Sequence, residues 1–361
     1  MKILLFIDSL GAGGAQRQFV GLANMLQEHD HNISIILYHN DMFYEKDLNS
    51  KISVEIIQNC SKVKRLICYY KIVKRLNPEC VIAYQETPSL IACAIKALSS
   101  NYRLIVSERN TTQYVGMKER IRFFLYRWAD AIVPNSYGQE EYLSNHYPWM
   151  KSKLKTITNF VDLQHFYYIN RSRNKIPEIA IVASIWESKN TLGFIEAVKL
   201  LADDGLNFHI SWYGKTTTNL EYLNKSQGLI DKYKINRFIQ LLDKTSNIKE
   251  VYQNADFFCL PSFYEGTPNV ICEAMATGLP IICSNICNNQ FYVNENKNGF
   301  LFNPNCIKSI ASSIKRALET DILTYNILCR NSRIAAEEKL DPKEFINKYL
   351  SIIDNKYEYK E

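Results

Sequence analysis

The sequence predicts an α/β protein of two doubly wound domains with parallel sheets, and three observations support this fold class. The chain has 361 residues, which is long for a single hydrophobic core. Short apolar runs alternate with helical segments in both halves, as in βαβ units. The polar stretch 170–177 separates the two series and is a candidate linker.

The first series of elements starts at the N-terminus. Residues 2–7 form an apolar run that ends at Asp8, which is too short for a signal peptide and predicts a buried strand. Residues 14–27 follow as a helix. The remaining strand-like runs of this half are 33–38, 54–57, 80–83, 104–107 and 131–134.

The second series repeats this alternation after the linker. Its strand-like runs are 179–183, 208–213, 238–241, 257–260 and 281–283. We therefore expect Rossmann-like domains at 1–170 and 171–341, with a C-terminal helix of about 342–361 packed back on the first. Such sheets bind ligands beyond the carboxyl ends of their strands, so we expect an interdomain cleft lined by loops of both.

Composition narrows the class of protein further. The net charge of +6 is modest, and its excess lies before residue 180. The ten cysteines form no CxxC pair and the six histidines no HExxH spacing, so we expect a reducing cytoplasm, no metal and no cofactor. The most apolar long stretch, 81–98, contains Gln85, Glu86 and Lys96 and does not resemble a membrane span.

A glycine-rich loop follows the first strand. Gly13 and Gly14 open the helix, where bare backbone amides favour a phosphate, and Arg17 in its first turn is a further candidate for contact with a ligand. Gln16 stands where the dinucleotide fingerprint needs its third glycine. A tight strand-to-helix turn without a ligand is the alternative.

The most informative segment is 261–280. A strand leads into a loop that carries Glu265, and a helix over 269–277 carries Glu273 and is closed by Gly278. Both carboxylates can then face one ligand at the helix N-terminus, whose free amides bind anions. The other residues expected to contact this ligand at the turn are Gly266, Thr267, Pro268, Asn269 and Val270.

Three features of this segment resemble the signature of glycosyltransferase family 4, a family with the GT-B fold. They are two glutamates eight positions apart, Gly-x-Pro between them, and the motif EAMAxGxP that begins at the second glutamate. The resemblance implies that Glu265 lies near the donor sugar and that Glu273 binds the ribose hydroxyls of the nucleotide. It also implies transfer with retention of anomeric configuration.

The segment 182–190 is similar to the family's strand and loop that present an arginine and a lysine to the donor diphosphate. Lys189 matches the lysine, whereas Ser184 takes the arginine's place. The chain contains no Asp-x-Asp, the usual clamp for a divalent ion. Lys189, the amides of Gly13 and Gly14, and the helix beginning near Pro268 are therefore expected to stabilise the leaving group.

In the first domain, the segment 106–110 ends a strand where many family members keep an active-site histidine. Arg109 takes that place, between Glu108 and Asn110 as candidates on the acceptor side. A structural salt bridge between Arg109 and Glu108 or another neighbour is the alternative.

The resemblance implies a nucleotide-sugar donor, with UDP-sugars favoured, and a glycan or polyprenyl-diphosphate-linked glycan acceptor in cell-surface polysaccharide synthesis. Basic, aromatic helices at 62–76 and 117–128 suit docking on an anionic membrane, so we expect a cytoplasmic protein peripheral to the inner face of that membrane and no nucleic-acid partner. The alternative is that their apolar stripes only pack on the sheet. A nicotinamide-dependent oxidoreductase and a catalytically silent partner subunit are the competing functions.

Overall fold

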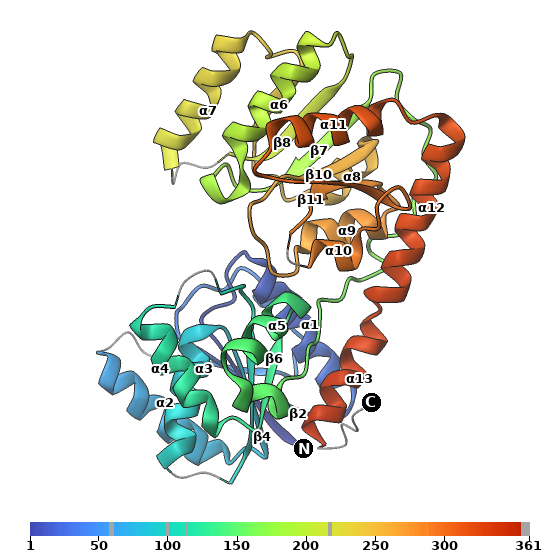
Figure 1. Cartoon of the computed structure of the whole chain (residues 1–361). Helices are drawn as coiled ribbons and strands as arrows, with labels where there is room; N and C mark the ends of the chain where they lie inside the picture. Colours follow the sequence, from blue (N-terminus) through green and yellow to red (C-terminus); the bar gives the residue numbers. More distant parts are fainter. Residues whose placement is uncertain (58–60, 99–100, 113–114, 216–218, 287, 355–361) are drawn as a thin grey trace. The chain divides into compact units, whose positions relative to one another are not determined.

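The computed structural model describes residues 1–57, 61–98, 101–112, 115–215, 219–286 and 288–354, and within them the chain forms two α/β units (Figure 1). The first unit contains residues 1–159 and 342–361, and the second contains 160–341. Each unit has its own six-stranded parallel sheet. Two doubly wound α/β units are thus present, as the alternation of apolar and helical segments predicts.

The first sheet has the strand order β3-β2-β1-β4-β5-β6. The chain crosses over from β3 to β4 on the far side of β1, which is the switch in strand order where such sheets bind ligands. Its strands are β1 Lys2–Ile7, β2 Asn32–Leu37, β3 Ser53–Ile56, β4 Cys80–Tyr84, β5 Arg103–Glu108 and β6 Ala131–Pro134. Its helices are α1 Gly14–Glu28, α2 Lys62–Leu76, α3 Glu86–Leu98, α4 Met117–Leu125 and α5 Tyr137–His146, with 3-10 turns η1 Glu45–Asp47, η2 Tyr126–Trp128 and η3 Pro148–Lys153.

The second sheet has the corresponding order β12-β11-β10-β7-β8-β9. Its strands are β7 Glu178–Val182, β8 His209–Lys215, β9 Ile239–Asp243, β10 Phe257–Leu260, β11 Ile281–Ser284 and β12 Gly299–Phe302. Its helices are α6 Thr191–Asp203, α7 Leu220–Tyr233, α8 Ile248–Asn254, α9 Asn269–Ala276, α10 Asn289–Tyr292, α11 Ile307–Leu318 and α12 Ile322–Lys339, with the 3-10 turn η4 Glu187–Lys189. Strand β12 was not among the expected runs, and it pairs with β11 through Ile281↔Gly299 to Ser284↔Phe302.

Side-chain alternation explains how the second sheet is covered. Ile179, Ile181, Ile210 and Trp212 point to one face, where they pack with α6, α7 and α11. The other face is covered mainly by α8, α9 and α12 around β10 and β11. Parallel sheets are normally buried on both faces, and here the second face is covered less completely at β8 than at β10.

The boundary between the units lies at Asn159/Phe160, whereas the linker composition predicts 170/171. The intervening residues hydrogen-bond to the second unit. Val161 N donates to Leu340 O at 3.1 Å, and Ile169 N donates to Thr277 O at 3.2 Å. A polar stretch indicates exposure but does not reveal which unit its backbone will bond to.

Helix α13, Pro342–Ile353, belongs to the first unit. The hydroxyl groups of Tyr84, on β4, and Tyr349, on α13, lie 2.8 Å apart, and both rings are fully buried. The C-terminal helix therefore completes the core of the first unit, next to the carboxyl end of β4.

Helix α2 buries a different face from the stripe that its apolar residues predict. Tyr69, Ile72 and Val73 are buried and packed on the core. Val63 is 65% exposed and Ile67 is 48% exposed, so these members of the expected stripe point outward. The helix has more apolar residues than one core-facing stripe can hold, and the alternative that they all pack on the sheet is wrong.

Candidate functional site

The segment after β10 has the predicted strand–loop–helix form. The buried strand Phe257–Leu260 ends in a loop, and α9 then runs from Asn269 to Ala276. Gly278, with φ of +83°, closes the helix in the left-handed region, where its amide donates to Met275 O at 2.9 Å. Pro268 lies one position earlier than expected, at the N-cap rather than in the first turn.

Lys189 and Glu265 meet at the carboxyl edge of the second sheet. The Lys189 Nζ lies 2.5 Å from Glu265 Oε1, and the Ser262 hydroxyl donates to the same oxygen at 2.6 Å. The amide of Phe263 donates to the carbonyl of Ser188 at 2.9 Å, which joins the loop after β7 to the loop after β10. The side chains of Lys189 and Glu265 are 22% and 15% exposed, so a ligand can reach both.

Glu273 occupies a more enclosed position. It is 3% exposed on α9, and its Oε2 accepts a hydrogen bond of 3.1 Å from the hydroxyl of Tyr252, on α8. That hydroxyl also lies 3.3 Å from the carbonyl oxygen of Val270. Glu273 is therefore held by a neighbouring helix, whereas Glu265 is held by Lys189 and Ser262.

The other donor-side candidates line the same turn. Thr267 is buried, and its hydroxyl accepts a hydrogen bond of 3.2 Å from the amide of Asn288. Asn288 stands in place of one of the family's usual glycines, and this substitution was the only sequence signal for its contact. The exposure of the remaining candidates differs: Pro268 is buried, Gly266, Asn269 and Val270 are half-buried, and Ser184 is exposed.

In the first unit, Arg109 lies just beyond β5 and is 7% exposed. Its guanidinium donates to Asn159 Oδ1 and stands over the ring of Tyr84, 5.0 Å from the ring centroid. Within the described residues, its Nε and Nη1 are buried without a hydrogen-bond partner. Arg109 forms no salt bridge with Glu108, so the alternative of a structural salt bridge between these two residues is wrong.

Glu108 is instead part of an interior ion pair. It is 3% exposed, accepts a hydrogen bond from the hydroxyl of Tyr126, and lies 3.5 Å from Arg122 Nη2 on α4. Burial raises the pKa of Glu108, and the Arg122 charge opposes that shift. These contacts give Glu108 a structural role and do not present it to an acceptor, contrary to expectation.

We predict that Arg122→Met destabilises the protein by about 3 kcal/mol, because it leaves the Glu108 carboxylate buried without its cation. With its pKa raised in the folded state, Glu108 favours folding only while it is protonated. The loss of unfolding free energy in Arg122→Met should therefore be small at acidic pH and should grow as the pH rises through the raised pKa of Glu108. Urea unfolding at several pH values measures this effect. The double variant Arg122→Met with Glu108→Gln should recover most of the lost stability, and a deficit independent of pH would contradict the assignment.

Two polar side chains near Arg109 were not singled out from the sequence. Asp8 Oδ1 and Gln85 Oε1 are buried without hydrogen-bond partners in the described structure, and burial raises the pKa of Asp8. The pairing of Phe6 with Ala83 places Asp8 beside Gln85 at the carboxyl edge. Gln85 also has a φ of +72°, a strained conformation found at functional sites. The sequence signal that could have identified Asp8 and Gln85 is that each of these polar residues directly follows a strand, β1 or β4.

The glycine loop has the predicted position. Gly13 is the N-cap of α1 with an extended backbone, and Gly14 begins the helix. An added Cβ on Gly13 would lie 2.4 Å from Oε1 of Gln16, so the end of this flexible side chain would have to move. Arg17 is half-buried, and Asn110 is exposed beyond β5.

Within the described part of the chain, no cluster of three or more His, Cys, Asp or Glu side chains is suited to hold a metal ion. The described helices also include none with the length and apolar character needed to cross a membrane.

Comparison with known proteins identifies the family. The model described as "Glycosyltransferase Family 4" matches residues 12–165, and "Glycosyl transferases group 1" matches residues 169–338. The two matches fall on the two units and leave little of the chain uncovered. A nicotinamide-dependent oxidoreductase is thereby excluded.

Two bacterial relatives are similar over most of the chain. An alpha-1,4-N-acetyl-D-galactosaminyltransferase of Campylobacter jejuni, named for a PP-undecaprenol-linked saccharide, is 26% identical over 83% of this chain and 84% of its own length. The UDP-Gal:alpha-D-GlcNAc-diphosphoundecaprenol alpha-1,3-galactosyltransferase of Escherichia coli is 27% identical over 75% of this chain and 74% of its own.

Solved structures share the fold. Anabaena HepE in complex with UDP superposes with a TM-score of 0.87 at 16% identity, over 98% of this chain and 100% of that one. A glycosyltransferase from Rickettsia africae has a TM-score of 0.85 at 18% identity, over 98% of both chains. With the GT-B fold, the two matching models and named transferases among its relatives, this chain belongs to glycosyltransferase family 4.

Proposed function

We propose that the protein transfers a sugar, with retention of anomeric configuration, from a UDP-sugar to a lipid-linked glycan during cell-surface polysaccharide synthesis. The observation that carries this proposal is the Lys189–Glu265 pair, which places a cation and a carboxylate side by side at the carboxyl edge of the second sheet. The names of the relatives support the donor and acceptor classes, since they include a UDP-sugar and undecaprenol-linked saccharides.

In this proposal the second unit holds the donor. Lys189 neutralises the diphosphate as the bond to the sugar breaks, together with the amides at the start of α9. Glu265 lies near the sugar, where its charge favours an oxocarbenium-like transition state, and Glu273 binds the ribose hydroxyls. We propose that no metal or other cofactor takes part.

The first unit holds the acceptor in this proposal, through the residues at the carboxyl edge of its sheet. Arg109 brings two buried N–H donors without protein partners, and Asp8 and Gln85 bring acceptor oxygens without them. A bound saccharide, with hydroxyls that both donate and accept, would satisfy all three. Arg17 lies in the first turn of α1, and Asn110 lies in the loop after β5.

A donor screen tests the proposal. The protein is incubated with UDP-, GDP- and ADP-sugars and an undecaprenyl-diphosphate-linked saccharide, and the released nucleotide and the glycolipid product are measured. We expect turnover with a UDP-sugar, and NMR of the new linkage should show the anomeric configuration of the donor. An inverted product, or transfer from GDP- or ADP-sugars only, would contradict the corresponding part of the proposal.

Lipid-linked acceptors require access to a membrane, and we propose that α2 and α4 supply the docking surface. Both helices contact α3 in the first unit (Figure 1). Beside the outward residues of α2, the α4 region exposes Met117 by 74% and Phe124 by 53%. The exposed lysines and arginines that surround these apolar side chains are Lys64, Lys71, Lys74, Arg75, Lys118, Arg120 and Arg127. This mixture favours the anionic inner face of the cytoplasmic membrane.

We predict that Lys71→Glu with Lys74→Glu weakens binding to vesicles of phosphatidylethanolamine and phosphatidylglycerol by at least about tenfold, because each lysine near an anionic surface contributes about 1 kcal/mol. Cosedimentation measures the effect. The matched control is Lys225→Glu with Lys232→Glu on α7, which makes the same charge change in the second unit. Equal binding by the first variant and the wild type would rule out this surface.

A further inference from the structure

The second unit has a pocket on one face of its sheet, and the residues that line it include neither Lys189 nor Glu265. The pocket has a volume of about 580 Å³, within the range of small-molecule sites. Glu178 and His209, which line it, are the first residues of β7 and β8. Lys189 and Glu265 follow the carboxyl ends of β7 and β10 instead. The pocket is therefore separate from the donor site within one unit.

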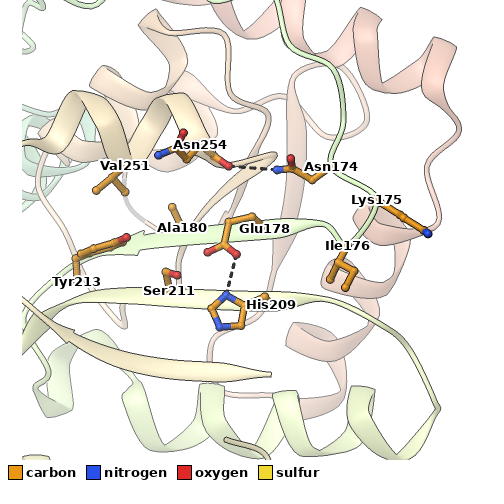
Figure 2. Close-up of a pocket in the computed structure, with 10 residues that line it drawn as sticks. All are labelled: Asn174, Lys175, Ile176, Glu178, Ala180, His209, Ser211, Tyr213, Val251 and Asn254. Carbon is orange, nitrogen blue, oxygen red and sulfur yellow. Dashed lines mark hydrogen bonds and ion pairs between the residues drawn. The ribbon is translucent and has the colours of Figure 1, made fainter. Parts of the chain in front are cut away.

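Strand register forms the floor of the pocket. Glu178 pairs with His209, Ala180 with Ser211 and Val182 with Tyr213, so these pairs stand on one face of the sheet. Ala180 and Ser211 are small, which leaves a hollow between the larger side chains. Figure 2 shows Tyr213 at one end of this hollow and the Glu178–His209 pair beyond Ser211.

The hollow is open because α8 is short. This helix has seven residues, and only its buried face, with Val251 and Tyr252, packs against the sheet. No described helix completes the cover over Tyr213 and His209. The isoleucines of β7 and β8 and Trp212 point to the other face, whereas on this face Ala180 belongs to the second core cluster and Val182 and Tyr213 pack against it.

The wall of the pocket is held in place by a buried carboxylate. Asp256 is 1% exposed, and its Oδ2 accepts hydrogen bonds from the amide of Glu178 at 2.7 Å and from Asn174 Nδ2 at 3.0 Å. The same Nδ2 donates to the carbonyl of Asn254 at 3.2 Å. The segment entering β7 is thus joined to the end of α8, and the pocket is preorganised rather than formed by a loose loop.

The polar groups of the pocket provide both donors and acceptors. Glu178 Oε2 and His209 Nδ1 lie 2.7 Å apart, and this hydrogen bond holds the pKa of His209 above its usual value. The remaining carboxylate oxygen and ring nitrogen can face a ligand. In the described structure, the hydroxyls of Ser211 and Tyr213 bond to no protein atom.

This chemistry excludes two classes of ligand. A phosphate or other anion would meet the Glu178 carboxylate, and an apolar molecule would bury the Glu178–His209 pair and the Ser211 hydroxyl without partners. A neutral saccharide has neither disadvantage. It carries no negative charge, its hydroxyls donate and accept hydrogen bonds, and its C–H faces pack on an aromatic ring such as that of Tyr213.

We propose that this pocket is a second, non-catalytic saccharide site, which holds part of a glycan away from the donor. The inference rests on the proposed function in one respect only: the saccharide is taken to be part of the glycan that the enzyme extends. A glycan held at two sites gains effective concentration at the reacting end.

Saturation-transfer NMR tests the pocket directly, with N,N′-diacetylchitobiose, lactose and maltotriose as probes. We expect transfer to at least one probe in the presence of saturating UDP. Ser211→Trp fills the hollow and should weaken that binding by at least about tenfold. The matched control Ser312→Trp makes the same substitution at an exposed position of α11 and should bind as the wild type does.

Tyr213→Ser provides a second variant that removes the aromatic ring without adding bulk, and it should also lose at least about tenfold. Thermal unfolding identifies any variant that fails to fold. The proposal is overturned if no probe binds the wild type, if UDP displaces the probe, or if the folded Ser211→Trp and Tyr213→Ser variants both bind normally. UDP binding and donor turnover are measured in parallel, so the failure of the proposed transferase reaction would be seen independently of saccharide binding.

Discussion

Replacing Lys189 with methionine is expected to lower kcat by about two to three orders of magnitude, the usual cost of removing one group that stabilises charge in a transition state. Lys189 is the side-chain cation of the segment 182–190 that the resemblance assigns to the diphosphate, and Ser184 offers no charge there. At about 4 Å from a phosphate oxygen and an effective dielectric constant of about 20, a lysine contributes up to about 4 kcal/mol before desolvation. Steady-state kinetics with the UDP-sugar found in the donor screen measures the effect.

The Lys189–Glu265 contact raises a second explanation, in which Lys189 only positions Glu265. A double-mutant cycle with Glu265→Gln separates the two roles. If Lys189 acts on the diphosphate, Lys189→Met should further reduce the activity of Glu265→Gln, and Lys189→Arg should retain part of it. If the loss from Lys189→Met disappears in the Glu265→Gln background, Lys189 is a positioning residue and the proposed diphosphate contact is wrong.

The second large effect is expected for Glu273→Gln, which should reduce kcat/KM by about 30- to 1000-fold. Hydrogen bonds to a charged group contribute about 1.5–3 kcal/mol each, and the ribose offers two hydroxyls. Glutamine keeps the shape of the side chain and can still accept from Tyr252, so the change removes mainly the charge. UDP binding measured by calorimetry should weaken in parallel, because a ribose contact acts on the nucleotide rather than on the sugar.

A matched control for Glu273→Gln is Glu319→Gln, which changes an exposed glutamate of the same unit and should leave kinetics and UDP affinity unchanged. Tyr252→Phe adds a test of position, because it removes the hydroxyl that holds the Glu273 carboxylate. We expect a smaller loss of kcat/KM and of UDP affinity for Tyr252→Phe than for Glu273→Gln. Normal UDP affinity in a folded Glu273→Gln protein would remove Glu273 from the nucleotide site.

Local patterns in the sequence were enough to predict the elements that carry the donor-side residues. The strand before Glu265, the helix that contains Glu273 and its end at Gly278 depend on neighbouring residues, and all three are present. Strand β12 was missed because it begins at Gly299 directly after Asn298, a pair typical of turns, and its pairing with β11 is not visible in the sequence. The roles of Glu265, Glu273 and Lys189 remain predictions, although the structure brings Glu265 and Lys189 into contact.

Sequence alone therefore determined the fold class, the family and the strand–loop–helix form of the segment that carries Glu265 and Glu273, because these follow from periodicity and from motifs of adjacent residues. The tertiary structure decided which side chains contact one another. Glu108 pairs with Arg122 rather than with Arg109, and Arg109 pairs with Asn159, fifty positions away. The outward apolar face of α2 and the uncovered floor beside Tyr213 likewise depend on which helices pack on each sheet. Such contacts join residues far apart in the chain, and no local pattern specifies which of several suitable side chains will meet.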